Sequence, residues 1–412
     1  MEPLNRSTIQ LLSLTRQYFV SGGKDCSVPD FAPEANFDEI MRLANLNSCD
    51  PFVYHTIWRW GAEYGLDEEV LKTYKNRMLF SAIGQLRADA ELKEVIAALN
   101  SGGVKFLLLK GVILSSLYPD PAYRRSCDAD IHVSDEYADL AAEILTERGY
   151  IYIPDEYNKY EKTYQLGGIL TIELHTKLFE NFYEKNRAAI LAAGLEMQCN
   201  RREVRVLDSL AETLAPNHFL IYVLCHHTKH FIYSGINLRH LIDICVFVNE
   251  YCEHLDWEFI ISSLERFYIK DFILNILYIC QYYLGMVDVS FLYNGIEDEV
   301  VTLLLQDIVG KDLDKADAMT RASAHEFVRG TYYGGEKNVA NVIKFSLFPN
   351  VKSLSPRYAY AKRHPVLLPL AWVHRVLSNL WRKMRGQATI SPAERSKFAQ
   401  ERVELLVRLR IL

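Results

Sequence analysis

The sequence predicts an α+β protein in which a small mixed sheet is flanked by N- and C-terminal helical regions. Apolar residues recur at three- and four-residue intervals over the first hundred residues and again from Leu210 to about Leu304, as in helices. Short apolar or alternating runs, typical of strands, are concentrated between residues 104 and 178. Half of the 412 residues are apolar and 24% are charged, which excludes a disordered or low-complexity chain.

The N-terminal region is expected to contain helices at Ser7–Phe19, Phe37–Leu46 and Asp67–Asn100. The last of these begins with three acidic residues, which suit the positive end of a helix, and it stops before Ser101-Gly102-Gly103. The central region then combines strands with one helix over Ser134–Arg148. We expect the strands at Val104–Leu109, Asp128–Val133, Tyr160–Leu166 and Ile169–His175, the last two joined as a hairpin by Gly167-Gly168.

The change of pattern along the chain predicts four parts. The uncharged run Phe272–Val287 is shorter than the ~20 residues of a membrane span, so a buried helix is expected there. Ala393–Leu412 is expected to form a final amphipathic helix. The predicted parts are an N-terminal helical region at 1–100, an α/β core at 101–205, a helical domain at 206–335 and a basic C-terminal segment with its helix at 336–412.

Acidic residues alternate with apolar ones in two of the predicted strands. Side chains two apart on a strand share a face, so Asp128, Asp130 and His132 point one way, and Glu173 and His175 share a face of the later strand. If the two strands are neighbours, three carboxylates converge and raise one another's pKa unless a cation neutralises them. Oxygen ligands of this kind suit Mg²⁺, and the implied chemistry is phosphoryl or nucleotidyl transfer.

A simpler interpretation is that the Asp-x-Asp pair lies on a solvent-facing strand. Nearby residues favour the phosphate hypothesis: a strand ends at Lys110-Gly111 and leads into a short helix, where backbone N–H groups can face a phosphate. Arg124 and Arg125 precede the acidic strand and could meet phosphate oxygens. A surface turn after Pro119-Asp120-Pro121 accounts for either arginine equally well.

The stretch FLLLKGVILSSLYPDPAYRRSCDADIHV, followed by a helix, RGY and IELH, resembles uncharacterised bacterial nucleotidyltransferases of the DNA polymerase β-like superfamily. The resemblance covers residues 100–250 approximately. It implies Mg²⁺, with Mn²⁺ as a substitute, bound by Asp128, Asp130 and Glu173, and NTP phosphates held near Lys110 and Gly111. The superfamily's glycine-serine pair is represented here only by Lys-Gly, at a longer distance from Asp128.

A second polar cluster lies in an otherwise apolar helix. His226 and His230 are four residues apart and could share a zinc ion, but the glutamate of the HExxH motif is absent. The preferred interpretation is a patch that faces the nucleotide, with Lys229 on phosphates and His226 or His230 on the base or acceptor. Arg239 and Asp243, also four apart, are expected to form a structural pair on the next helix.

The segment Lys337–Ala393 contains ten Lys or Arg and no Asp or Glu, although the whole chain carries −6. It is interpreted in three ways: a helix packed on its own core with a solvated basic side, a binding surface for an anionic acceptor such as tRNA, or a surface that rests on an anionic membrane. Eight scattered cysteines without a CxxC pair, and no signal peptide, predict a reduced cytoplasmic protein, with peripheral membrane attachment as the alternative.

The expected activity is that of an enzyme, a Mg²⁺-dependent nucleotidyltransferase that moves a nucleoside monophosphate from NTP to an acceptor hydroxyl and releases pyrophosphate. The sequence does not distinguish among four classes of acceptor: a small molecule, a glycan, a protein and tRNA. Two alternatives are a toxin-like nucleotidyltransferase that modifies tRNA and a degenerate, non-catalytic nucleotide-binding or scaffold protein.

Overall fold

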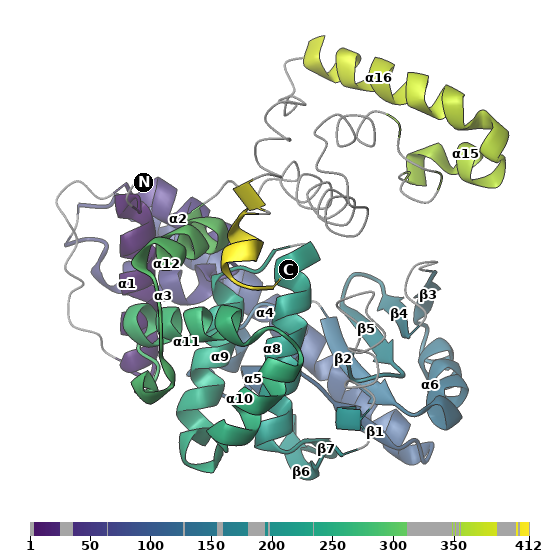
Figure 1. The fold of residues 1–412 in the computed structure, drawn as a ribbon, viewed down its shortest axis with the longest axis horizontal. Helices are drawn as coiled ribbons and strands as arrows, with labels where there is room; N and C mark the ends of the chain where they lie inside the picture. The colour runs from purple at the N-terminus through teal and green to yellow at the C-terminus, as the bar shows by residue number, and fades with distance from the viewer. Residues whose placement is uncertain are drawn as a thin grey trace. The chain divides into compact units, whose positions relative to one another are not determined.

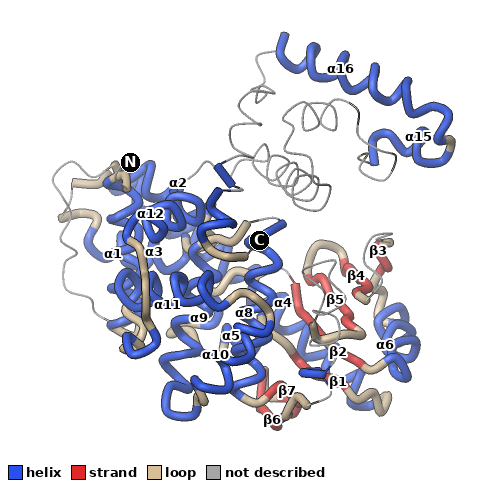
Figure 2. The backbone as a smooth tube through the Cα atoms, in the orientation of Figure 1, coloured by secondary structure: helices blue, strands red, loops and turns tan. Residues whose placement is uncertain are grey.

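The computed structural model shows an α+β protein that is mostly helical and contains one seven-stranded mixed sheet, as the sequence predicts (Figures 1 and 2). Its residues form two compact units, one made of Met1–Lys229 and Ile236–Gly310 and the other of His230–Gly235 and Lys311–Leu412. The domain boundaries expected from the sequence stay a prediction. The structure describes residues 4–24, 36–63, 65–126, 128–154, 160–179, 194–196, 198–233, 235–310, 348, 351, 354, 356–384, 401–402 and 404–411.

The helices predicted for the N-terminal region are confirmed, and each begins at a side chain that caps it. The Asn5 side chain accepts from the Thr8 N–H, and the Asp67 side chain accepts from the Glu69 N–H, each at 2.7 Å. These caps satisfy backbone donors that have no partner within the helix. The helices of this region are α1 (Arg6–Val20), α2 (Phe37–Leu46), α3 (Asp50–Trp60) and α4 (Glu68–Ser101).

The sheet has the strand order β3-β4-β5-β2-β1-β7-β6. The pairs β2–β5 and β1–β7 are parallel, and the other neighbours are antiparallel. Helices α4 and α6 (Asp135–Glu147) contact each other and pack on the sheet, and the short α5 (Gly111–Ser115) follows β1. The strands are β1 (Phe106–Leu108), β2 (Asp128–Val133), β3 (Ile151–Ile153), β4 (Glu161–Leu166), β5 (Leu170–His175), β6 (Arg201–Val206) and β7 (Ser209–Leu214).

The predicted hairpin between β4 and β5 is confirmed. Its two central residues, Gly167 and Gly168, have φ values of 49° and 75°. Two successive positive φ values are what a tight two-residue hairpin turn requires, and glycine adopts them without steric cost.

The expectation of helix from Leu210 onward is wrong over its first residues. Ser209–Leu214 forms strand β7, which pairs with β1 and with β6, and helix begins only at Pro216. The β6–β7 turn has Leu207 at φ 49° and Asp208 at φ 60°, so it makes a tight hairpin without glycine. The apolar residues after this turn therefore belong to the sheet.

Helices fill the remainder of the first unit, as predicted, and gather beside the sheet (Figure 1). The uncharged run from Phe272 lies in α11 as far as Leu284, and the aliphatic residues of this helix are buried, so the prediction of a buried helix is confirmed. Within the described residues no helix is long and apolar enough to cross a membrane. These helices are α8 (Pro216–Tyr233, whose last turn belongs to the second unit), α9 (Leu238–Tyr251), α10 (Trp257–Arg266), α11 (Lys270–Leu284) and α12 (Asp298–Leu305).

The second unit contains α15 (Ala359–Arg363) and α16 (Leu368–Met384), with a small core of Leu354, Tyr358, Ala361 and Ala371. Much of the basic segment 337–393 and of the expected helix 393–412 lies outside the described residues. The interpretations of the basic segment therefore stay predictions.

Candidate active site

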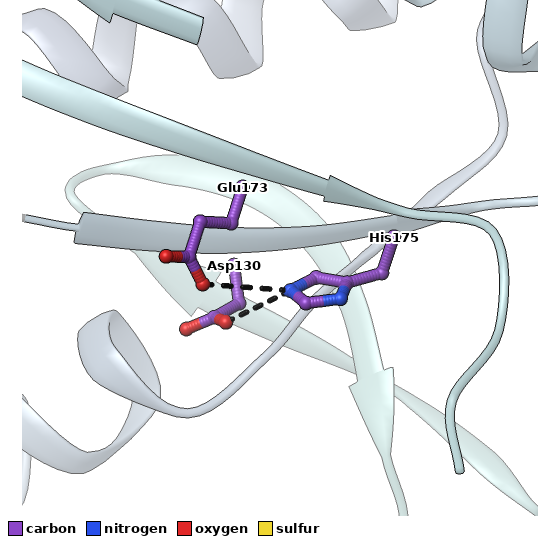
Figure 3. Close-up of side chains that lie close together, drawn as sticks. All are labelled: Asp130, Glu173 and His175. Atoms are coloured by element: carbon purple, nitrogen blue, oxygen red, sulfur yellow. Dashed lines mark hydrogen bonds and ion pairs between the residues drawn. The ribbon is translucent and has the colours of Figure 1, made fainter. Parts of the chain in front are cut away.

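The candidate site is built on the parallel pair β2–β5. In this register Asp130 lies opposite Glu173, Asp128 opposite Thr171, and His132 opposite His175. The two acidic strands are thus direct neighbours, and the group of possible metal ligands among the described residues includes Asp130 and Glu173 but not the expected third carboxylate, Asp128. Figure 3 shows Asp130, Glu173 and His175 directed toward one another.

The ligand atoms of Asp130, Glu173 and His175 all lie within 4.8 Å of one another, close enough to hold a metal ion. His175 Nε2 is 3.0 Å from Asp130 Oδ1 and 3.8 Å from Glu173 Oε2, and His175 Nδ1 is 3.8 Å from Glu161 Oε2. The sequence placed His175 on the polar face of β5 but gave it no role. Its position two residues after Glu173 is the signal that could have identified it.

Asp130 and Glu173 have opposite pKa shifts. Burial and the neighbouring charges of Asp130 and Glu161 raise the pKa of Glu173 to about 8. Burial acts in the same direction on Asp130, but Lys110 and His175 outweigh it and hold the pKa of Asp130 well below its usual range. At neutral pH Asp130 is therefore ionised and Glu173 is protonated. A cation bound between them would ionise Glu173 as well.

Lys110 lies against the same carboxylate. Its Nζ is 2.9 Å from Asp130 Oδ1 and 2.7 Å from His226 Nε2. Lys110 is buried, and its backbone has φ 30° and ψ −91° in the turn between β1 and α5. Of the residues that the sequence proposed for nucleotide binding, Lys110 thus contacts Asp130, and His226 contacts Lys110.

Arg124 is also buried, but it binds a carboxylate from a different helix. Its Nε and Nη2 donate to the two oxygens of Asp243 on α9 at 2.8 and 2.9 Å. Tyr118 and Arg239 also donate to Asp243, at 2.8 and 3.2 Å, so the predicted Arg239–Asp243 pair is confirmed as part of a larger network. The nearby arginines overcome burial and lower the pKa of Asp243 to about 2.

The third guanidinium nitrogen of Arg124 faces Gly111. Nη1 is buried and has no hydrogen-bond partner among the described residues. A Cβ added to Gly111 would lie 3.4 Å from Nη1 and 3.5 Å from the Asp128 carbonyl oxygen and the Ser126 hydroxyl. Glycine therefore leaves open the space between α5, Arg124 and the start of β2, while the Asp128 carboxylate accepts a hydrogen bond from Ser126 at 2.8 Å.

The other proposed phosphate ligands have different surroundings. Arg125 is partly exposed and pairs with Asp50, the first residue of α3. Lys229 is half-buried on α8, one turn after His226. Within the described part of the chain, the group of potential metal ligands includes neither His226 nor His230, so the structure gives no support to zinc on that helix.

The residues around Asp130 fit a divalent cation. Two carboxylates and an imidazole are donors that Mg²⁺ or Mn²⁺ accepts, although Mg²⁺ prefers oxygen. Burial, with the nearby charges of Asp130 and Glu161, raises the pKa of Glu173, and a divalent ion bound there would favour its ionised form.

Some solved structures are similar to this chain, with low sequence identity. An antigenic nucleotidyltransferase-like protein from Paracoccidioides brasiliensis matches with 13% identity and a TM-score of 0.31, over 51% of this chain and 97% of that one. A tRNA nucleotidyltransferase complexed with a primer tRNA and an incoming ATP analogue matches with 12% identity and a TM-score of 0.22, over 77% and 96%. With TM-scores this low, neither likeness carries an argument about the site.

No curated protein matches this chain. The sequence model of one family does match, over residues 33–285, which is more than half of the chain and contains every strand of the sheet. That family is described as uncharacterised nucleotidyltransferase, the family that the motifs around Asp128 and Glu173 resemble. The chain therefore belongs to this family of nucleotidyltransferases.

Proposed function

We propose that this protein transfers a nucleoside monophosphate from NTP to an acceptor hydroxyl and releases pyrophosphate. The observation that carries the proposal is the parallel register of β2 and β5, which sets Asp130 opposite Glu173 beside a buried lysine. Family membership supports the same class of reaction.

Asp128, Asp130 and Glu173 would hold the divalent ion, Mg²⁺ or Mn²⁺. His175 would add a nitrogen ligand or orient Asp130 by the hydrogen bond that it makes now. When bound, the ion would neutralise charge on the phosphates and lower the pKa of the attacking hydroxyl.

The cationic residues around these carboxylates would bind the triphosphate. Lys110 and Arg124 are the best supported, because Lys110 is beside Asp130 and the buried Nη1 of Arg124, next to Gly111, has no hydrogen-bond partner among the residues that the structure describes. Arg125, Lys229 and His226 complete the proposed set, with Lys229 and His226 contributed by α8.

In the proposed reaction the acceptor oxygen bonds to the α-phosphorus of the nucleotide. The bond from that phosphorus to the bridging oxygen of the β-phosphate breaks, and pyrophosphate leaves with the electron pair. A carboxylate oxygen of Glu173, which the bound ion would keep ionised, would accept the proton of the acceptor hydroxyl.

Replacement of single carboxylates tests the proposal. Asp128→Asn or Asp130→Asn should lower NTP turnover at least about 100-fold, because each loses a charged ligand while its volume is kept. Turnover is measured as pyrophosphate release with Mg²⁺, each NTP and cell extract. Asp139→Asn, on the exposed face of α6, is the matched control and should keep full activity. Full turnover in the Asp130 variant would sink the proposal.

The acceptor is identified by following the label. The protein is incubated with each α-labelled NTP, Mg²⁺ and cell extract, and the labelled product is separated into RNA, protein, glycan and small-molecule fractions. Label in tRNA would establish the tRNA-modifying alternative. Nucleotide binding with no transfer to any fraction would establish the non-catalytic one.

A further inference from the structure

A positive charge of the chain itself lies where the proposed cation would bind. The Lys110 ammonium contacts Asp130 Oδ1 at 2.9 Å, and the two side chains are only 10% and 2% exposed. The ammonium also donates to His226 Nε2 at 2.7 Å, so it connects β2 to α8. Separating such a buried ion pair leaves an uncompensated charge, so it is costly unless another charge takes the place of the lost partner.

The backbone at Lys110 has a strained conformation. Its φ of 30° with ψ of −91° lies outside the regions that residues with a side chain ordinarily adopt. Strand β1 ends at Leu108 and α5 begins at Gly111, so Lys110 occupies the sharp turn between them. Such conformations persist where the surrounding structure holds them, and they are concentrated at functional sites.

We propose that Lys110 is a built-in counter-ion that keeps the divalent cation away from Asp130 until a nucleotide arrives. The inference rests on the proposed function. A divalent ion at Asp130 would lie within a few ångströms of the ammonium, and at that distance the repulsion is strong in a buried site. A triphosphate supplies several negative oxygens, and the flexible stem of Lys110 allows its ammonium to move from Asp130 to one of them. The Asp130 carboxylate can then bind the ion.

This role predicts opposite effects on two ligands measured separately. Without Lys110 the cation alone should bind more tightly, because its competitor is gone. The nucleotide alone should bind more weakly, because a phosphate partner is gone. A purely structural role for Lys110 would weaken both, so the direction of the change in cation affinity separates the two explanations.

The test uses two neutral variants, Lys110→Met and Lys110→Gln, and it can be carried out if either of them folds. Free Mn²⁺ is titrated by electron paramagnetic resonance without nucleotide, and each NTP is titrated calorimetrically in EDTA. We expect the Mn²⁺ Kd to fall at least about tenfold and the NTP Kd to rise at least about tenfold. Lys110→Arg, which keeps the charge, should retain weak Mn²⁺ binding.

Lys105→Met is the matched control, because Lys105 is exposed and lies just before β1. Both of its affinities should equal those of the original protein. An unchanged or weaker Mn²⁺ affinity in a folded neutral variant would overturn the role of Lys110. Failure of the original protein to bind NTP with or without Mn²⁺ would instead overturn the proposed function itself.

Discussion

Asp130 and Glu173 lie opposite each other on the parallel strands β2 and β5. Burial acts on both, but their different neighbours lead to pKa shifts in opposite directions. Asp130 touches Lys110 and His175, whereas Glu173 lies near Glu161 and Asp130. The pattern of alternating residues predicted that these carboxylates share a patch. It did not predict the ion pair with Lys110, because a strand pattern contains no information about which cation lies opposite a side chain.

Asp243 shows how a buried acid organises this region from a distance. It accepts from Tyr118, Arg124 and Arg239, and Arg124 is 119 residues away along the chain. The pair Arg239–Asp243 was predictable from its spacing of four on one helix. The contact with Arg124 was not, because it depends on how α9 packs against the turn before β2.

We predict that Asp243→Asn destabilises the protein by about 3 kcal/mol, because the Arg124 charge stays buried without its counter-charge. The free energy of unfolding is measured by urea denaturation. Tyr118→Phe, which removes one hydrogen bond to the same carboxylate, should cost only about 1 kcal/mol. Equal losses in the two variants would mean that the buried charge is balanced by another group.

At the scale of elements, the predictions succeeded where periodicity and turn residues agreed. Helices α1, α2 and α4, strand β2 and the Gly167-Gly168 hairpin all lie where they were expected. The β6–β7 hairpin was missed because its turn uses Leu207 and Asp208 in a conformation that usually requires glycine or asparagine. Short apolar runs after such a turn fit helix and strand equally well.

Leu207→Asn should stabilise the protein by about 0.5–1 kcal/mol, because asparagine tolerates the positive φ at this position better than leucine does. The measurement is the midpoint of urea unfolding. Leu210→Asn, at the exposed second position of extended β7, is the control and should give no gain. A gain at both positions would point to solubility instead of turn strain.

For the whole molecule, the raised pKa of Glu173 couples stability to pH. The folded protein keeps the Glu173 proton up to a pKa of about 8, whereas the unfolded chain loses it near 4.5. Between these values the folded state binds more protons, so the contribution of Glu173 to stability falls as pH rises. A divalent ion bound to ionised Glu173 would remove this loss.

We therefore expect Glu173→Gln to melt at least about 2 °C above the original protein at pH 8.5 in EDTA. The gap should be small well below pH 4.5, where the original Glu173 is protonated in both states. Differential scanning calorimetry provides the measurement, and Glu147→Gln, an exposed position at the end of α6, is the control. A gap that does not change with pH would contradict the proton assignment.

The sequence by itself determined the class of fold, the family and the acidic strands, because these depend on local periodicity and on motifs within one continuous stretch. It also determined that Asp128 and Asp130 share a face, since alternation along a strand requires it. Only the tertiary structure decided that Asp130 pairs with Lys110, that His175 joins the carboxylates, and that Arg124 is bound by Asp243. These contacts join residues far apart in the chain, and their partners depend on the register of β2 with β5 and on the packing of α8 and α9.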